Sequence, residues 1–460
     1  MVSDARPSSG GEDKMQVVRN MSLRNVVVRF LATAVLAWLA AGRVPAVVAD
    51  DWPQWRGPTR DGVWRETGII EQFDKPHLDP VWRVKVGSGY CGPTVARGRV
   101  YVADRLVQPK QIERVHCFDA ATGETLWTYA YDCAYRGVQY DAGPRASISI
   151  DDGRAYSLGT MGRLFCFDAA KGKVLWQKDL NHLYKIRMPI WGIAASPLVE
   201  GDLLIVQIGG EDHACLVAFD KRTGQERWRA LDDEASYAAP IVVKQAHKRV
   251  LVCYTAQNVV GLDPQSGKAY WTYPFPPTQM VIGIATPVYY RGMLFLSNFF
   301  DGSLLLRLAK DHMAVEKLWH RAGPSERKTD ALQSIISTPL LQGKNIYGVD
   351  SYGELRCLDL LTGDRIWQSD RAVPRARWAT IHFVRNGDRV WMFNEKGELI
   401  ISRLSPKGFE EISRAKLITP TRDQLPSRRG GVCWSHPAFA GKHVFARNDK
   451  ELLCVDLTAH

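Results

Sequence analysis

The chain has 460 residues, of which 45% are hydrophobic, 10% are aromatic and 24% are charged, and its formal net charge is +11. This composition is that of a globular chain with a sizeable core, and it excludes an intrinsically disordered or collagen-like protein. Because no nucleic-acid-binding motif accompanies the moderate positive charge, we expect no nucleic acid partner.

The first 49 residues differ from the rest of the chain. Residues 1–20 are polar, and we expect them to be disordered or to lie upstream of the true start. Residues 21–49 begin with basic residues, continue with an apolar run from Phe30 to Ala41, and end in small residues at Ala49. This order is typical of a secretory signal peptide, here cleaved after Ala49. An uncleaved anchor is the alternative, although the run is short for a membrane span.

A cleaved signal peptide predicts an exported protein of the periplasm or cell envelope, with no transmembrane span in the mature chain. Removing residues 1–49 takes away six Lys/Arg and three Asp/Glu, which lowers the net charge from +11 to about +8. The segment 50–80 then opens with Asp51-Trp-Pro-Gln-Trp-Arg-Gly-Pro58, which is too apolar for a free tail and too rich in Pro and Gly for a helix. We expect an ordered N-terminal segment packed on the rest of the chain, and a binding role for it is the alternative.

A strand–turn–strand pattern recurs along the chain, and its clearest copy is Cys166-Phe-Asp168-Ala-Ala-Lys-Gly172-Lys-Val-Leu-Trp176. The Asp carboxylate can accept hydrogen bonds from the amides of the turn, and Gly supplies a positive φ. The Trp ends an outer strand and needs an apolar cover that one repeat cannot supply, so neighbouring repeats must stack. The turn aspartates are Asp119, Asp168, Asp220, Asp263, Asp359 and Asp456.

The spacing of these turns predicts the fold class. Successive turns lie 43–52 residues apart, except for two intervals of 96 and 97 residues that each hide one degenerate copy, at 304–308 and 399–404. The chain therefore has eight turn positions, and a period of this length with four strands per unit is typical of propeller blades. We predict an all-β, eight-bladed β-propeller of four-stranded antiparallel blades over residues 81–460.

The two ends of the repeat array are complementary. The last repeat stops at Leu452–Asp456 without an outer strand, and the strand Val81–Val86 has no preceding turn. We expect the N-terminal strand to complete the C-terminal blade, because closure removes the exposed edges of an open array. A closed ring of this kind is expected to be a monomer.

A small residue followed by Pro precedes six apolar runs, which we interpret as the innermost strands of blades, since Pro is tolerated at the start of a strand. Residues just before these strands line one mouth of the central channel. The candidates for a ligand-binding site there are Tyr90, Arg145, Trp191, Tyr237, Gln333, Trp378, Trp434 and His436. Arg145 among Trp rings could bind an anionic or aromatic ligand. We expect it instead to pair with a neighbouring carboxylate, and the rings and His436 could simply pack on adjacent strands.

Other polar and sulfur-containing residues give weaker signals. Nine cysteines in an exported chain suggest disulfides, but four lie two residues before a turn Asp, at an inward position typical of small core residues. The acidic stretches 211–213 and 232–234 could bind calcium, although we expect solvated turns. Six arginines in late loops could form one basic face for an anionic polymer, although we expect a solvated surface. They are Arg371, Arg375, Arg377, Arg422, Arg428 and Arg429.

The turns and the Pro-led strand starts resemble the pyrroloquinoline quinone (PQQ)-type propeller repeat family, from roughly Trp52 to the C-terminus. The start Trp52-Pro-Gln-Trp-Arg-Gly-Pro58 is similar to that of exported PQQ-like propellers of planctomycete-type bacteria. More distantly, the chain is similar to BamB, a scaffold lipoprotein of outer-membrane protein assembly, and to quinoprotein alcohol dehydrogenases. The resemblance implies an eight-bladed ring.

The resemblance leaves the function open, because the family contains both enzymes and scaffolds. Its dehydrogenases typically carry adjacent cysteines over the cofactor, calcium ligands and a catalytic Asp, whereas no two cysteines are adjacent here and no c-type haem motif is present. We predict an exported binding or scaffold protein of the cell envelope, with a protein or envelope polymer as partner and no assigned catalytic residue or metal ligand. The alternatives are an oxidoreductase that uses PQQ and calcium on alcohols or sugars, and a small-ligand-binding propeller without catalysis.

Overall fold

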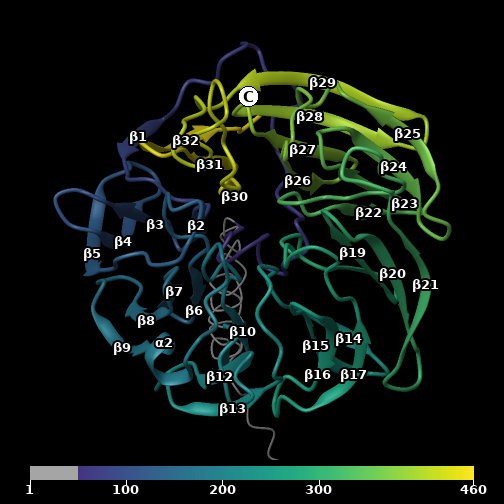
Figure 1. Cartoon of the computed structure of the whole chain (residues 1–460). Helices are drawn as coiled ribbons and strands as arrows, with labels where there is room; N and C mark the ends of the chain where they lie inside the picture. The colour runs from purple at the N-terminus through teal and green to yellow at the C-terminus, as the bar shows by residue number, and fades with distance from the viewer. Residues whose placement is uncertain (1–49, 460) are drawn as a thin grey trace, which may run out of the picture. The chain divides into compact units, whose positions relative to one another are not determined.

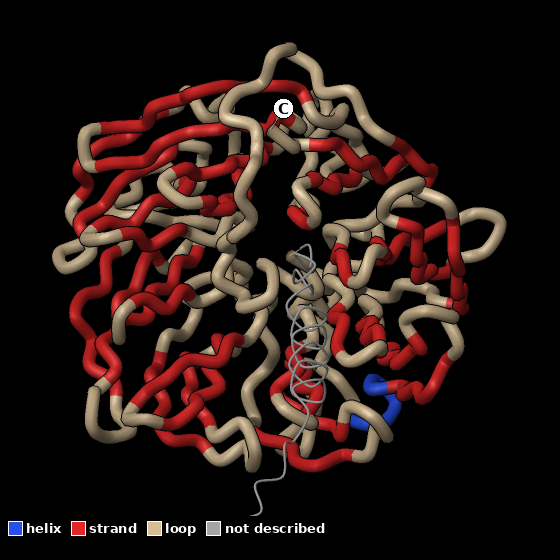
Figure 2. Tube along the Cα trace, turned by 180° about the vertical axis from the view of Figure 1, so that it is seen from behind, coloured by secondary structure: helices blue, strands red, loops and turns tan. Residues whose placement is uncertain are grey.

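The computed structural model describes residues 50–459, which form eight four-stranded antiparallel sheets arranged in a ring (Figure 1). This confirms the predicted all-β, eight-bladed propeller. The expected signal peptide at 21–49 and the residues before it lie outside the described residues. Figure 2 shows the ring from behind, with its one described helix, α2 (Leu180–Tyr184), at the outer edge.

Each of the first seven blades uses four consecutive strands, ordered from the axis outward. Blades 1 and 2 are β2 (Thr94–Ala96), β3 (Arg99–Leu106), β4 (Ile112–Asp119), β5 (Thr125–Asp132), and β6 (Ser149–Asp151), β7 (Arg154–Leu158), β8 (Arg163–Asp168), β9 (Val174–Asp179). Blades 3 and 4 are β10 (Leu198–Glu200), β11 (Leu203–Gln207), β12 (Leu216–Asp220), β13 (Glu226–Ala230), and β14 (Ile241–Gln245), β15 (Lys248–Tyr254), β16 (Asn258–Leu262), β17 (Ala269–Pro274). Blades 5 and 6 are β18 (Val288–Tyr290), β19 (Met293–Asn298), β20 (Gly302–Leu308), β21 (Val315–Arg321), and β22 (Leu340–Gln342), β23 (Asn345–Val349), β24 (Leu355–Asp359), β25 (Arg365–Ser369). Blade 7 is β26 (Ile381–Asn386), β27 (Arg389–Asn394), β28 (Glu398–Ser405), β29 (Gly408–Lys416).

The eighth blade joins the two ends of the ring. It consists of β30 (Ala438–Ala440), β31 (His443–Arg447), β32 (Glu451–Asp456) and, outermost, β1 (Trp82–Lys85). The strand β1 runs antiparallel to β32, with Trp82 opposite Cys454 and Lys85 opposite Glu451. The predicted closure by the N-terminal strand is therefore confirmed.

The Pro-led strand starts are also as predicted. In six blades the innermost strand begins at the residue directly after the Pro, as β10 does after Pro197. The inner strands and their neighbours form the buried core, and all nine cysteines are buried in it as free thiols. The expected core position of the four cysteines that precede a turn Asp is therefore confirmed, and the other five are buried and free as well.

The turn between the third and fourth strands has the expected internal hydrogen bonds. In blade 2, Asp168 Oδ1 accepts the backbone N–H groups of Ala170 and Lys171 at 2.9 and 3.0 Å. Gly172 follows with φ of 68°, in the left-handed region that favours glycine. The Asp168 side chain thus fixes the conformation of the turn, and the glycine leaves a flat surface on which a side chain of the neighbouring blade can pack.

The neighbour is the Trp of the preceding blade. Trp127 of blade 1 lies on Gly172 of blade 2, where an added Cβ would be 2.6 Å from the indole ring, and its Nε1 donates to the Ala169 carbonyl at 3.0 Å. The same donation to the next blade's turn links Trp82 to Ala120, Trp176 to Lys221, Trp228 to Pro264, Trp319 to Leu360 and Trp367 to Ser405. Trp271 differs because blade 5 has a degenerate turn, and it donates to Gln245 Oε1 within its own blade.

Residues 51–66 cross the end of the central channel and connect several blades. Trp52 pairs with Val95 of blade 1, and Val63 pairs with Arg385 of blade 7. Arg60 reaches the other side, where it donates to the Ser196 and Pro240 carbonyls at 3.4 and 3.0 Å. This segment therefore closes one end of the channel as well as tying blades together.

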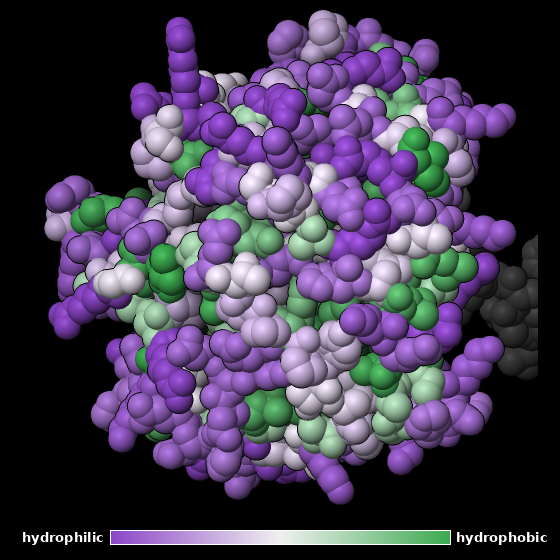
Figure 3. Space-filling model, turned by 45° about the vertical axis from the view of Figure 1, so that its right-hand side comes forward, coloured by the Kyte–Doolittle hydropathy of each residue, from purple (hydrophilic) through white to green (hydrophobic). Residues whose placement is uncertain are grey.

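The outer surface is mainly polar, with small, separate apolar patches on the face that Figure 3 shows. In residues 50–459, no helix is long and apolar enough to span a membrane.

We expect Gly172→Ala to destabilise the ring more than Gly98→Ala, although both glycines have a positive φ. The left-handed backbone costs alanine about 1–2 kcal/mol at either position, but an added Cβ meets the Trp127 ring only at Gly172, and nothing lies within 4 Å at Gly98. Overpacking adds ~1–3 kcal/mol, and chemical denaturation of the two variants measures this excess. Equal losses would contradict the role of Gly172 as a seat for the indole.

Candidate functional site

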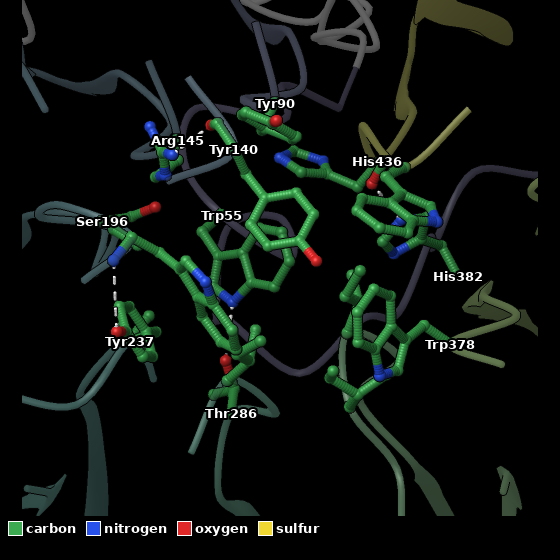
Figure 4. A pocket seen from close by; sticks show the side chains of 17 residues that line it. Trp55, Tyr90, Tyr140, Arg145, Ser196, Tyr237, Thr286, Trp378, His382 and His436 are labelled. Carbon is green, nitrogen blue, oxygen red and sulfur yellow. Dashed lines mark hydrogen bonds between the residues drawn. The ribbon is translucent and has the colours of Figure 1, made fainter. Parts of the chain in front are cut away.

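A cavity of about 150 Å³ lies on the axis of the ring, and all eight blades contribute residues to its lining (Figure 4). Most of these residues immediately precede a first strand. Tyr237 and Ala239 lie four and two residues before β14, and Trp434 and His436 take the same positions before β30. Because alternate side chains of an extended segment point to the same side, both positions face the axis in two successive layers.

Seven of the eight residues singled out in the sequence line this cavity: Tyr90, Arg145, Trp191, Tyr237, Trp378, Trp434 and His436. Gln333 does not. It is buried beside blade 5, where its amide donates to the Phe299 carbonyl at 2.7 Å and accepts the Gly323 N–H at 3.0 Å. Its hydrogen bonds are structural, because they hold loops on blades 5 and 6.

An aromatic cluster forms the mouth of the cavity. The ring of Tyr140 stands edge-on to Trp191 and Trp378, with centroids 5.9 Å away in each case, and lies 6.4 Å from Trp434. Trp191 in turn packs against Tyr237 at 5.0 Å. Tyr140 belongs to the loop between blades 1 and 2, which the repeat pattern does not cover, so its place at the mouth could not be read from the repeats.

The opposite end of the cavity is closed by Trp55 of the N-terminal segment. Its Nε1 donates to Thr286 Oγ1 at 2.8 Å, and its ring meets His436 edge-on at 4.5 Å. The sequence marks this tryptophan only through the expectation of a packed segment. Together Tyr140 and Trp55 make the cavity an aromatic chamber with one closed end.

Arg145 does not pair with a carboxylate, so that expectation is wrong. Its guanidinium donates to the carbonyls of Gly143 and Gln139 at 2.8 and 3.0 Å and to that of Tyr140, and it lies over the Tyr90 ring at 4.9 Å. Within residues 50–459 it forms no ion pair. Arg145 therefore folds the loop that carries Tyr140 and brings a positive charge without a counterion to the cavity.

Two buried histidines lie near the closed end. His436 Nε2 lies 2.7 Å from Ser147 Oγ, and its Nδ1 faces the Pro437 carbonyl at 3.2 Å, which assigns the proton to Nδ1. His382, which the sequence did not single out, donates from Nε2 to the Trp434 carbonyl at 2.8 Å. Desolvation by burial lowers the pKa of His382 to about 4 and that of His436 to about 3, so both are neutral at pH 7.

The acidic stretches act as solvated turns. Asp232 pairs with His213 at 2.9 Å, and Asp233 accepts hydrogen bonds from Thr255 and Asn258. Nowhere in the described part of the chain do three or more His, Cys, Asp or Glu side chains form a group that could hold a metal ion.

The six arginines of the late loops do not act as free cations together. Three of them pair with carboxylates: Arg375 with Glu354, Arg377 with Glu326, and Arg428 with Glu395. Two others, Arg371 and Arg422, donate to backbone carbonyls, and Arg429 is exposed.

A family model described as "Outer membrane protein assembly factor BamB" matches residues 111–369 and 318–459, which is most of the chain. The chain belongs to the BamB-like family of PQQ-repeat propellers. Among individual proteins of this family, an outer membrane protein assembly factor BamB of Shewanella oneidensis is 24% identical over 163 residues. That match covers 35% of this chain and 40% of the relative's length.

Solved structures show the same fold at low sequence identity. BamB from Moraxella catarrhalis superposes with a TM-score of 0.56 and 16% identity, covering 83% of this chain and 98% of that one. A europium-containing methanol dehydrogenase gives a TM-score of 0.61 and 12% identity, with 86% and 89% of the chains covered. Quinohemoprotein alcohol dehydrogenase from Comamonas testosteroni gives 0.58 and 14%, with 93% and 85% covered. BamB and dehydrogenases thus share this fold, so the fold alone does not assign a function, which has to be argued from the lining of the cavity.

The buried histidines predict a loss of stability in mild acid. Their folded pKa values lie below the unfolded value of about 6.5, so the unfolded chain binds protons first as the pH falls. The free energy of unfolding should then drop by about 1.4 kcal/mol per histidine for each pH unit below 6.5, down to the folded pKa values.

Denaturation of the wild type and of His436→Gln between pH 7 and pH 5 measures this dependence. The variant should show the shallower slope, whereas His182→Gln, at an exposed position, should follow the wild type. Parallel slopes for all three proteins would contradict the assignment of a buried, neutral His436.

Proposed function

We propose that the protein is a binding ring of the cell envelope, a scaffold that engages a protein partner on the face where the axial cavity opens. The aromatic mouth carries this proposal. Tyr140, Trp191 and Trp378 are partly exposed there, and the Arg377 guanidinium stacks on Trp378 at 4.4 Å. Tryptophan, tyrosine and arginine are the residues that most often supply binding energy at protein interfaces.

Membership in the BamB-like family supports an envelope role, since its named relative is an outer membrane protein assembly factor. A cleaved signal peptide at 21–49 would bring the chain to that compartment.

The residues of the cavity do not fit the oxidoreductase alternative. Among residues 50–459 no carboxylate lines the cavity, so calcium would lack the carboxylate oxygen ligands that it favours. None of the nine cysteines lies in the lining. Of the described residues, Arg145 is the one cationic side chain in the lining, and it donates hydrogen bonds to backbone carbonyls. The lining is suited to apolar and aromatic contact rather than to a metal-assisted redox reaction.

Site-specific photo-crosslinking in cells that produce the protein tests the proposed binding face. A photoreactive residue in place of Ile190, beside Trp191 at the mouth, should give a defined protein adduct. The matched control replaces Leu361, which is 57% exposed in a turn between third and fourth strands, at the opposite ends of the blades.

We expect the adduct from position 190 to exceed that from position 361 at least tenfold and to weaken when Trp378→Ala is added. Equal adducts from both positions, or an adduct from position 361 alone, would overturn the proposed binding face.

A further inference from the structure

The ring of Tyr140 occupies the cavity in the manner of a ligand. Figure 4 shows its side chain pointing into the chamber, toward Trp378. Its hydroxyl forms no hydrogen bond with any residue of the described chain, and its ring contacts are the edge-on indoles of Trp191 and Trp378 and the tilted indole of Trp434. The side chain is only partly buried, so it fills the open mouth of the chamber rather than a closed core.

The backbone at the mouth is strained. Tyr140 has φ of 51° and Trp378 has φ of 66°. Apart from the two histidines His213 and His247, they are the only residues of the described chain with an aromatic side chain and a positive φ. A positive φ is uncommon for a bulky residue, and such strain gathers at ligand clamps and switches. The two strained residues are in direct edge-on contact with each other.

Two hydrogen-bond donors at the same place lack acceptors. The indole Nε1 atoms of Trp191 and Trp378 are buried and have no partner among the described residues. Both rings contact Tyr140, so a ligand group that took the place of Tyr140 would lie against the same two indoles. Buried donors without acceptors are costly, and a ligand that brought acceptor oxygens would relieve that cost.

The residue after Tyr140 shows where a carboxylate would bind. Asp141 lies outside the cavity, and its Oδ2 is 3.2 Å from the guanidinium of Arg105, whose side chain is only 3% exposed. Arg145, four residues after Asp141 in the same loop, has no carboxylate partner within residues 50–459. Without a partner, the propeller thus carries a Tyr–Asp pair of its own, in which the phenol ring of Tyr140 lies in the chamber and the carboxylate of Asp141 pairs with Arg105.

We propose that this chamber is a docking site for an aromatic residue followed by an acidic residue on the protein partner, and that Tyr140–Asp141 fills it until the partner displaces them. The partner's ring would take the place of Tyr140 among the three tryptophans, and its carboxylate would take the place of Asp141 on Arg105. Oxygen atoms of the incoming segment would accept hydrogen bonds from the indole N–H groups of Trp191 and Trp378. The inference rests on the proposed function, which assigns a protein partner to this face.

The test uses the purified protein and the dipeptide acetyl-Tyr-Asp-amide, with the indole N–H signals of Trp191 and Trp378 followed by NMR. The variants Trp191→Phe and Trp378→Phe assign the two signals. We expect Tyr140→Ala to bind the dipeptide at least tenfold more tightly than the wild type, with shifts of both signals. Acetyl-Ala-Asp-amide should not bind, and acetyl-Tyr-Lys-amide should bind several-fold more weakly.

Two further variants keep the test decisive. Asp141→Ala removes the carboxylate that competes for Arg105 without emptying the chamber, although Arg105 still donates to the backbone carbonyl of residue 141. It should also bind more tightly than the wild type even if Tyr140→Ala fails to fold. Tyr289→Ala, at a partly exposed tyrosine on β18, should behave as the wild type. Equal affinity of the wild type and both loop variants, or shifts confined to other tryptophans, would overturn the inference.

The result separates this inference from the proposed function. Crosslinks at position 190 without dipeptide binding would contradict the docking site but support the proposed binding face. Dipeptide binding without crosslinks would support the docking site but contradict the proposed envelope scaffold.

Discussion

The packing of one tryptophan on the glycine of the next repeat is the contact on which the ring depends. In the contact of Trp127 with Gly172, the indole ring occupies space that a Cβ would need, and the indole N–H donates a hydrogen bond to the Ala169 carbonyl of the turn. Because six of the eight blades place a tryptophan on the turn of the next blade, a partial ring would leave an indole exposed. The N-terminal strand solves this for the last blade, since Trp82 of β1 docks on the turn of blade 1.

The same contact explains why the fold could be predicted from sequence and the site only in part. Asp168, Gly172 and Trp176 recur with the period of the blades, so the blade number, the strand starts and the closure all follow from it. The cavity lining beside the first strands follows too, because its positions share that period. Tyr140 and Trp55 lie in segments outside the repeat, and no periodic signal places them on the axis. Arg145 was assigned a carboxylate, yet backbone carbonyls of its own loop satisfy it.

Both ends of the axial cavity are occupied by aromatic side chains of the chain itself. Its own N-terminal segment seals one end with Trp55, and its own loop fills the other with Tyr140. The described residues between them are two neutral histidines, aromatic rings and one arginine, with no carboxylate among residues 50–459. The dehydrogenases share only the fold with this chain, at 12–14% identity, so the function of the chain has to be argued from the residues of its own axis. A chamber of this kind is suited to recognising a side chain.

Calorimetric titration of the purified protein with PQQ, with and without calcium, tests most directly whether the axis serves binding of a partner rather than quinone chemistry. The account predicts no calcium-dependent heat and no calcium-dependent shift in melting temperature, because the lining offers no carboxylate ligand. Calcium-dependent binding of micromolar affinity or tighter, followed by reduction of an artificial electron acceptor with an alcohol or a sugar, would contradict it.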